Sequence, residues 1–151
     1  MLPRPPEIWG ESLGEATPKV KKIFRLQERA VRILSRVDQH VSCRNLFKEL
    51  NIFTLPSLYI REFVCKARIN WGQMKQNEEI HDHSTRQKSD FHTQYCRTTL
   101  LKNSYENVGI KPFNNLPNEL KKRGKPQEFK RRLQTFLRQH VFHSVDEYTA
   151  F

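Results

Sequence analysis

The alternation of apolar and polar positions predicts a long helix near the start of the chain. Thr17-Pro18 is a helix-start signal, because threonine caps a helix and proline suits its first turn. Apolar residues then recur every three or four positions, which is the period of an amphipathic helix. They are Val20, Ile23, Phe24, Ala30, Val31, Leu34 and Val37. Basic side chains fall on the other side, so a basic amphipathic helix of about five turns is expected.

Two more helices follow in the pattern. A short one is expected from a Ser42 cap to Leu50, and Asn51 suits the position that ends a helix. The next begins near Pro56 and continues to about Asn70. Its first half has so few polar side chains that it should be the central core helix. The apolar residues expected to build the core here are Leu46, Phe47, Leu50, Leu55, Leu58 and Ile60.

The second half of the chain is less regular. Residues 72–94 are polar and aperiodic, which is typical of a long surface connection. Residues 95–113 fit either a strand or a broken helix, because Gly109 and Pro112 oppose a continuous helix. Both alternatives stay open for this stretch.

Regular patterns return toward the C-terminus. Leu116-Pro117-Asn118 opens a short helix that Gly124 is expected to end, and Pro126 starts a long one. The apolar face of the long helix carries Phe129, Leu133, Phe136, Leu137 and His140. A capping-box pattern at residues 144–147 predicts a last helical turn that contains Tyr148.

Together these elements predict a mostly α-helical fold, a small irregular bundle of about five to six helices, with an extended segment around residues 95–113 as the alternative there. Residues 1–16 should be an irregular lead-in and residues 17–151 a single helical domain. No apolar run approaches the length of a membrane span, and the proline-rich start is unlike a signal peptide. Three cysteines without a disulfide pattern favour a reduced, nuclear or cytoplasmic location.

The charge of the chain narrows the expected partners. A formal net charge of +11 favours polyanions, which release counterions when a basic surface binds them. Residues 19–36 hold seven Lys/Arg against one acid, and residues 121–138 hold eight against one. We therefore expect RNA or DNA as the partner, held through its phosphates, and neither a small-molecule substrate nor a membrane.

Basic residues at helical spacing are the candidate phosphate contacts. They are Lys22, Arg25, Arg29, Arg32 and Arg36, and then Lys121, Lys122, Arg123, Lys130, Arg131 and Arg132. Nearby aromatic residues are candidates for stacking on unpaired bases: Phe24, Trp71, Tyr95 and Phe129. The simpler alternative is a solvated charged surface. Residues 121–125 also match a short nuclear-import pattern.

Enzymatic and metal chemistry find little support in the sequence. Four potential zinc ligands lie close together in the chain: His81, His83, His92 and Cys96. Their spacing fits no zinc finger, so solvated loop histidines are the simpler interpretation. Cys43 and Cys65 lie on expected helices where packing explains them without a nucleophilic role. We therefore expect no catalytic residue, no metal and no cofactor.

Six short motifs, taken in order, resemble one known family. They are Ile23 to Leu34, Cys43 to Leu55, Ile80-His81 with Thr85-Arg86, Asn115-Leu116-Pro117, Phe129-Lys130 with Leu133, and Ser144 to Tyr148. Their order and spacing, over about residues 9–149, are similar to the region after the polymerase domain in insect jockey-like non-LTR retrotransposon reverse transcriptases. Each motif alone is weak, but the series is specific.

This resemblance implies an RNA-directed DNA polymerase as the parent, with this region near the template–primer duplex. A polymerase needs paired metal-binding aspartates. The aspartates here, Asp38, Asp82, Asp90 and Asp146, are scattered. The chain is therefore expected to be a nucleic-acid-binding C-terminal fragment without the catalytic centre. The alternative is a structural or protein-interaction module, or a relic, that packs against the parent's thumb through the apolar face of the first helix.

Overall fold

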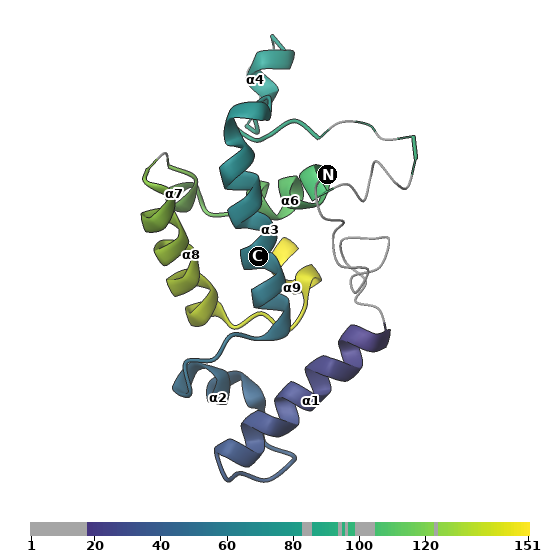
Figure 1. Cartoon of the computed structure of the whole chain (residues 1–151), viewed down its shortest axis with the longest axis vertical. Helices are drawn as coiled ribbons and strands as arrows, with labels where there is room; N and C mark the ends of the chain where they lie inside the picture. The colour runs from purple at the N-terminus through teal and green to yellow at the C-terminus, as the bar shows by residue number, and fades with distance from the viewer. Residues whose placement is uncertain (1–17, 83–85, 94, 96, 99–104, 123) are drawn as a thin grey trace.

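The computed structural model describes residues 18–82, 86–93, 95, 97–98, 105–122 and 124–151, and this part of the chain is mostly helical, as predicted (Figure 1). The elements are α1 (Pro18–Leu34), α2 (Cys43–Glu49), α3 (Leu55–Ile69), the 3₁₀-helix η1 (Asn70–Gln73), α4 (Asn77–Ile80), α6 (Tyr105–Asn114), α7 (Asn118–Lys121), α8 (Pro126–His140) and α9 (Val145–Thr149). The described α-helices exceed the expected five to six because α4 lies in the expected surface connection and α6 in the stretch where a strand was the alternative. The expected lead-in, residues 1–16, lies outside the described residues.

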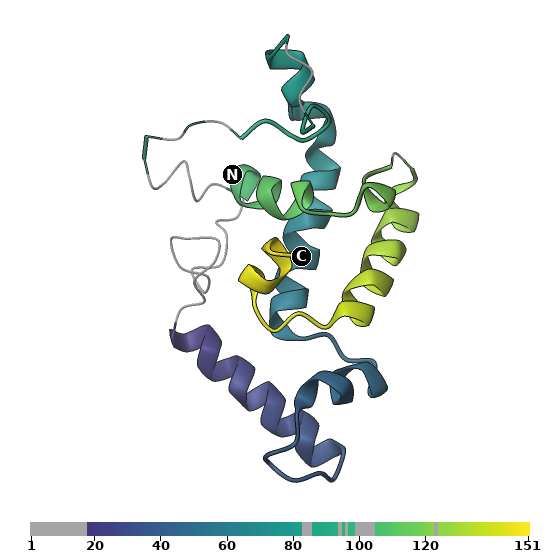
Figure 2. The ribbon, with the colours of Figure 1, turned by 180° about the vertical axis from the view of Figure 1, so that it is seen from behind.

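Helix α3 runs through the centre of the molecule, as the sequence predicts. Its cap is Thr54, whose side-chain oxygen accepts a hydrogen bond from Ser57 N at 3.2 Å. Ile60 and Val64 are fully buried, which contributes about 1.5–3 kcal/mol for each side chain. The helices α6, α8 and α9 pack around α3 (Figures 1 and 2).

Helix α6 crosses α3 so closely that one position must be glycine. A Cβ atom on Gly109 would lie 2.8 Å from the backbone oxygen of Phe63 and 3.2 Å from Ala67 Cβ. The helical alternative holds for residues 105–113, and α6 continues through Gly109 and Pro112, because packing against α3 outweighs the low helix propensity of both residues. The strand alternative fails for residues 105–113, and part of residues 95–104 lies outside the described chain.

Seven of the sixteen described residues buried in the main core around α3 are aromatic. The rings of Phe91 and Phe113 have centroids 5.0 Å apart, and Trp71 meets Phe91 edge-on at 4.8 Å. Buried Tyr148 donates its hydroxyl hydrogen bond to the Pro112 carbonyl, which ties α9 to α6. These offset and edge-on arrangements are the ones that aromatic rings prefer.

The expected surface connection at 72–94 is wrong in part. Residues 70–80 form η1 and α4, and an isolated bridge pairs Gln76 with Phe91. Phe91 is 2% exposed, and the side-chain amide of Asn114 holds both its backbone groups, at 3.0 Å to N and 2.9 Å to O. Buried Phe91, with half-buried Met74 packed against the same core, thus fixes a largely polar segment, and two isolated anchors give no periodic signal.

The C-terminal helices follow the predicted pattern with one boundary shifted. Helix α8 spans Pro126–His140 as expected, and Ser144 caps α9 by accepting a hydrogen bond from Glu147 N at 3.0 Å. Helix α7 ends at Lys121, because Lys122 already has an extended backbone, so Gly124 is not its terminator.

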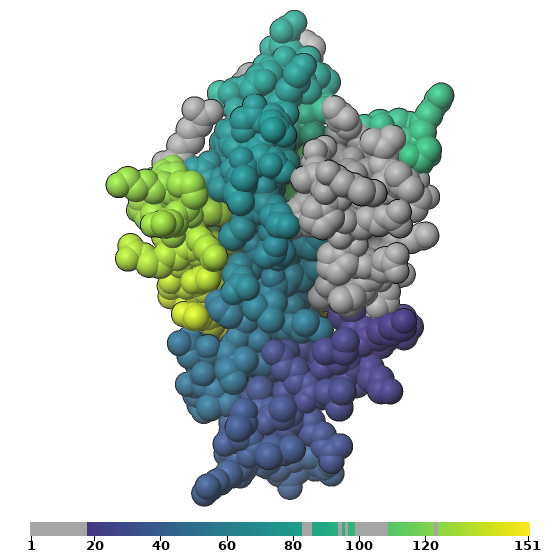
Figure 3. All heavy atoms as spheres, viewed as in Figure 1, coloured from purple at the N-terminus to yellow at the C-terminus, as the bar shows by residue number. Residues whose placement is uncertain are grey.

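A second, smaller core joins α1 to the body through α2. Its buried members are Val31, Cys43, Leu46, Phe47 and Val141. Asn51 ends the α2 segment with φ 57°, as predicted, but Leu50 is 38% exposed and not a core residue. Leu50 follows the last turn of α2, where its side chain points away from both cores. The result is a helix α1 that forms one end of the molecule (Figure 3).

The close crossing of α3 and α6 gives a stability prediction. Replacing Gly109 with alanine should lower the free energy of unfolding by about 1–3 kcal/mol, since the new Cβ would displace the Phe63 carbonyl. The matched control is Gly72→Ala, because no atom lies within 4 Å of that Cβ position, and its effect should stay within about 0.5 kcal/mol. Urea unfolding measures both; equal effects of the two substitutions would contradict the crossing.

Candidate nucleic-acid interface

The outer surface of α1 divides into two arcs that run along the helix. At 3.6 residues per turn, four exposed basic side chains form the basic arc: Lys21, Lys22, Arg25 and Arg29. Beside it lies an exposed apolar arc: Ile23, Leu26, Ala30, Ile33 and Leu34. The side that faces the body carries Phe24, Gln27 and Val31.

The apolar arc corrects the predicted packing of α1. Ile23, Ala30 and Leu34 are expected on the packed side, yet Ile23 is 47% and Leu34 65% exposed. Apolar residues cover about half of the circumference of α1, but α2 is the helix that it mainly contacts, and α2 covers a narrower strip. None of the described helices combines the length and apolar character that a membrane crossing requires.

The side chain of Gln27 sets how α1 is turned about its own axis. Its Nε2 donates to the Phe53 carbonyl at 2.8 Å, and its Oε1 accepts from Leu55 N at 2.9 Å. Phe53 lies in the segment that connects α2 to α3, and Leu55 is the first residue of α3. Because two hydrogen bonds fix one planar amide, Gln27 must face the body, and the basic arc then faces outward.

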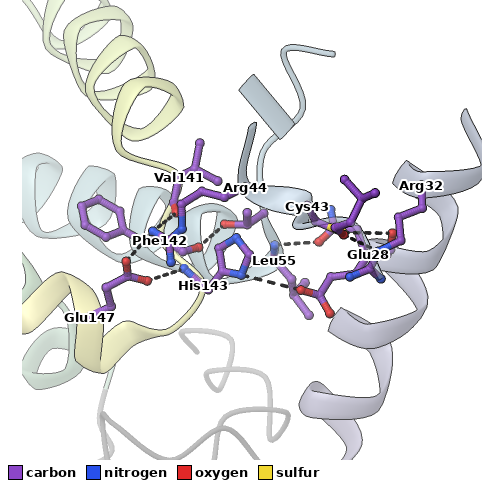
Figure 4. A network of polar contacts seen from close by, with 12 residues as sticks. Glu28, Arg32, Cys43, Arg44, Leu55, Val141, Phe142, His143 and Glu147 are labelled. Carbon is purple, nitrogen blue, oxygen red and sulfur yellow. Dashed lines mark hydrogen bonds and ion pairs between the residues drawn. The ribbon is translucent and has the colours of Figure 1, made fainter. Parts of the chain in front are cut away.

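A polar network adds a second attachment between α1 and the C-terminal segment (Figure 4). His143 Nδ1 lies 3.6 Å from Glu28 Oε1 on α1. Arg44 on α2 pairs with Glu147 and also donates to the Val141 carbonyl at 3.2 Å. The second Glu147 oxygen accepts from His143 N at 2.8 Å. The network therefore connects α1, α2 and α9.

Burial controls the titration of this network. It lowers the pKa of His143, and the positive charge of Arg44 lowers it further, against the smaller opposing effects of Glu28 and Glu147. Burial alone would raise the pKa of Glu147, but hydrogen bonds from Arg44 and from His143 N, together with the charge of Arg44, lower it overall. At neutral pH the network thus contains a neutral imidazole and an ionised carboxylate.

Two of the phosphate contacts predicted from residues 19–36 are not part of the basic arc. Arg32 is half-buried, and its Nε donates to the Val41 carbonyl at 2.9 Å, so it holds the loop after α1 (Figure 4). Arg36 is exposed but lies beyond the helix end with φ 54°. Lys22, Arg25 and Arg29 keep the predicted place, and Lys21 joins them.

The second predicted cluster is only partly available to a ligand. Lys121 Nζ lies 2.8 Å from Asp90 Oδ1 in a mostly buried ion pair, and Arg132 lies 3.8 Å from Glu128. Lys122, Lys130 and Arg131 are exposed. Arg123 lies outside the described residues. The ion pair of Lys121 also removes one charge from the import-like pattern at 121–125.

Three arginines that the sequence analysis passed over lie along the contact of α3 with α8. Arg61 and Arg138 both lie over the Phe53 ring, 5.4 and 4.6 Å from its centroid. Arg68 lies 4.6 Å from the Trp71 ring centroid. Such contacts are attractive because the ring face is electron-rich. The spacing of Arg61 and Arg68, two helical turns apart, indicates that they share one side of α3. Only a core helix is predicted there from the sequence, so this signal is not used.

Positive charges near the contact of α3 with α8 also affect the pKa of Cys65. Burial raises the pKa of the Cys65 thiol, against the charges of Lys130 and Arg61, which therefore lie near the sulfur. Burial likewise raises the pKa of Cys43, whose Sγ donates to the Glu28 carbonyl at 3.5 Å. Neither thiol is an activated nucleophile in this structure.

The four candidate zinc ligands do not form a metal site among the described residues, and the candidate stacking residues differ widely in exposure. His81 and His92 have ring centroids 5.7 Å apart, while His83 and Cys96 lie outside the described residues. Within the described chain, no three His, Cys, Asp or Glu side chains could hold a metal ion. Among the stacking candidates Tyr95 is 92% exposed, Phe129 is buried, and Phe24 and Trp71 are half-buried.

The neutral state of buried His143 predicts a pH dependence of stability. Its pKa is lowered in the folded protein, so the unfolded chain takes up a proton first as the pH falls. The free energy of unfolding should therefore decrease from about pH 6.5 downward. Urea unfolding between pH 7.5 and 5 measures this, and His143→Gln should flatten the curve. A wild-type curve that is already flat would contradict the buried neutral imidazole.

Compared with known protein families, with curated proteins and with solved structures, the chain shows no match.

Proposed function

We propose that this chain is a nucleic-acid-binding helical module that holds the phosphate backbone of RNA or DNA on the basic arc of α1. The observation that carries the proposal is the outward row of Lys22, Arg25 and Arg29, with no acid among them. The one acid of α1, Glu28, faces His143. At 1.5 Å rise per residue, neighbouring members of the row are about 4.5–6 Å apart along the helix, within reach of consecutive phosphates.

The charge outside the arc supports the same proposal. The whole chain carries +11, and Lys122, Lys130 and Arg131 add exposed cations at α7 and α8. The resemblance to the region after a retrotransposon polymerase agrees with it, as a fragment without the catalytic centre, working in the nucleus or cytoplasm. We propose no catalysis by this chain, since its described thiols are buried with raised pKa values.

Charge reversal on the arc tests the proposal. The variant Lys22→Glu, Arg25→Glu, Arg29→Glu should lose on the order of 100-fold or more in affinity, and the slope of log K against log salt should fall by about two to three. Fluorescence anisotropy with single-stranded RNA, single-stranded DNA and duplex at two salt concentrations measures both quantities. Because all three side chains are exposed, the unfolding midpoint should stay near that of the wild type.

The matched control changes the same number of charges elsewhere. Lys75→Glu, Arg86→Glu, Lys88→Glu alters three exposed cations of the segment between α3 and α6. If both triple variants lose the same affinity, the effect comes from net charge alone and the assignment to the basic arc is wrong. If wild-type protein binds none of the three nucleic acids, the proposed function itself is wrong.

A second function is favoured by the apolar arc. Leu26, Ile33 and Leu34 are 58%, 67% and 65% exposed on one side of α1, which is more than a solvated helix needs. We propose as the alternative a protein-interaction module, in which this arc packs against a neighbouring domain of the parent. Under this alternative, the isolated chain should self-associate through the apolar arc, and it should show no salt-sensitive binding of nucleic acid. Sedimentation of the isolated chain tests this alternative at a concentration on the order of 100 μM, where weak apolar contacts should form. A monomer at that concentration would contradict it.

A further inference from the structure

A groove between α7 and α8 lies apart from the basic arc and has an aromatic wall. It is a hollow of about 610 Å³, within the roughly 300–1,000 Å³ range of small-molecule sites. Leu120 and Pro117 lie on the α7 side, and Phe136 and His140 line it from α8. Phe151, after α9, is also among the lining residues.

Three rings in this groove lie against one another and are open to solvent. The centroids of His140 and Phe151 are 4.6 Å apart, and those of Phe136 and His140 are 4.5 Å apart. Phe151 is 66% exposed, while Phe142 beneath the cluster is buried. Phe151 is therefore a mostly exposed ring that meets Phe136 and His140 edge-on, and an exposed aromatic ring is a surface on which a planar base stacks.

The rim of the groove carries charges that suit a nucleotide strand. Arg131 is exposed on the α8 side, and Arg132, which is half-buried and lies 3.8 Å from Glu128, lines the groove beside it. Glu119 is on the α7 side, where its carboxylate would accept from a base amino group and repel a phosphate. Phosphates therefore belong on the α8 rim and the base belongs in the groove.

We infer that this groove binds an unpaired base of single-stranded RNA or DNA, stacked on Phe151 beside His140, while Arg131 and Arg132 hold the flanking phosphates. This inference rests on the proposed nucleic-acid binding and adds its substrate class. Bases inside a duplex are already stacked on their neighbours and cannot enter the groove, so the site distinguishes single strands from duplex.

Removal of the ring without loss of apolar character tests the inference. Phe151→Leu should weaken binding of a single-stranded oligonucleotide by roughly 5- to 100-fold, whereas Phe151→Trp should keep or strengthen it. The salt slope and the affinity for duplex should stay unchanged in both variants. Ile69→Ala, at another highly exposed apolar residue, is the control and should leave all affinities unchanged.

An abasic oligonucleotide of the same length separates stacking from charge. The wild type should bind the abasic strand more weakly than the base-containing one, and Phe151→Leu should remove that difference. Equal wild-type affinity for the two strands, or equal losses on both in Phe151→Leu, would overturn the inference while the proposed function stands. Absence of binding to either strand and to duplex would overturn both.

Discussion

The two hydrogen bonds of Gln27 are the constraint on which the functional surface depends. They pair one side-chain amide with Phe53 O and Leu55 N, on the segment that leads into the central helix α3. A helix held by apolar contacts alone can rotate between neighbouring packings, but a planar amide with two partners accepts one orientation. Since Gln27 faces inward, Arg25 and Arg29 must face outward. Breaking these bonds would leave a buried carbonyl and amide without partners, at a cost of about 1–3 kcal/mol each.

The small core and the polar network depend on the same orientation. Val31 lies one turn beyond Gln27 and reaches Phe47, while Glu28 reaches His143 (Figure 4). The apolar arc is then left outside, because α2 is too short to cover it. The structure thus places a cationic surface and an apolar surface side by side on one helix. The proposed nucleic-acid binding would use the first, and the proposed alternative would use the second.

The large positive charge of the chain is partly stabilising within the fold. Arg138 and Arg68 lie over aromatic rings, and Lys121 pairs with Asp90 where both are mostly buried. Cations with such internal partners contribute to stability, and the exposed ones remain available for the proposed binding of a polyanion. Net charge therefore overestimates the number of cations that a ligand can reach. Arg32 and Lys121, for example, lie in the two basic stretches of the sequence but bond to other parts of the fold.

The sequence predicted the elements that repeat a pattern and missed those fixed by single contacts. The spans of α1, α3 and α8 follow from helical periodicity with proline or threonine near the start. Gly109 was misread because its role depends on the approach of Phe63, which is 46 positions away in the chain. Phe91 was missed for the same reason, and so was the aromatic groove of Phe151. Burial of an isolated residue is decided by tertiary contacts, which periodicity does not contain.

The most direct test of the central claim is a nuclear magnetic resonance titration of the wild-type protein with a short single-stranded RNA, observing the arginine Nε–H groups and the backbone amides. The account predicts that Arg25 and Arg29 shift first and that the shifts diminish as salt is added. The structural Arg32, bonded to the Val41 carbonyl, should shift much less. Shifts confined to the apolar arc around Leu26 and Ile33, or none on α1 at saturating RNA, would contradict the account.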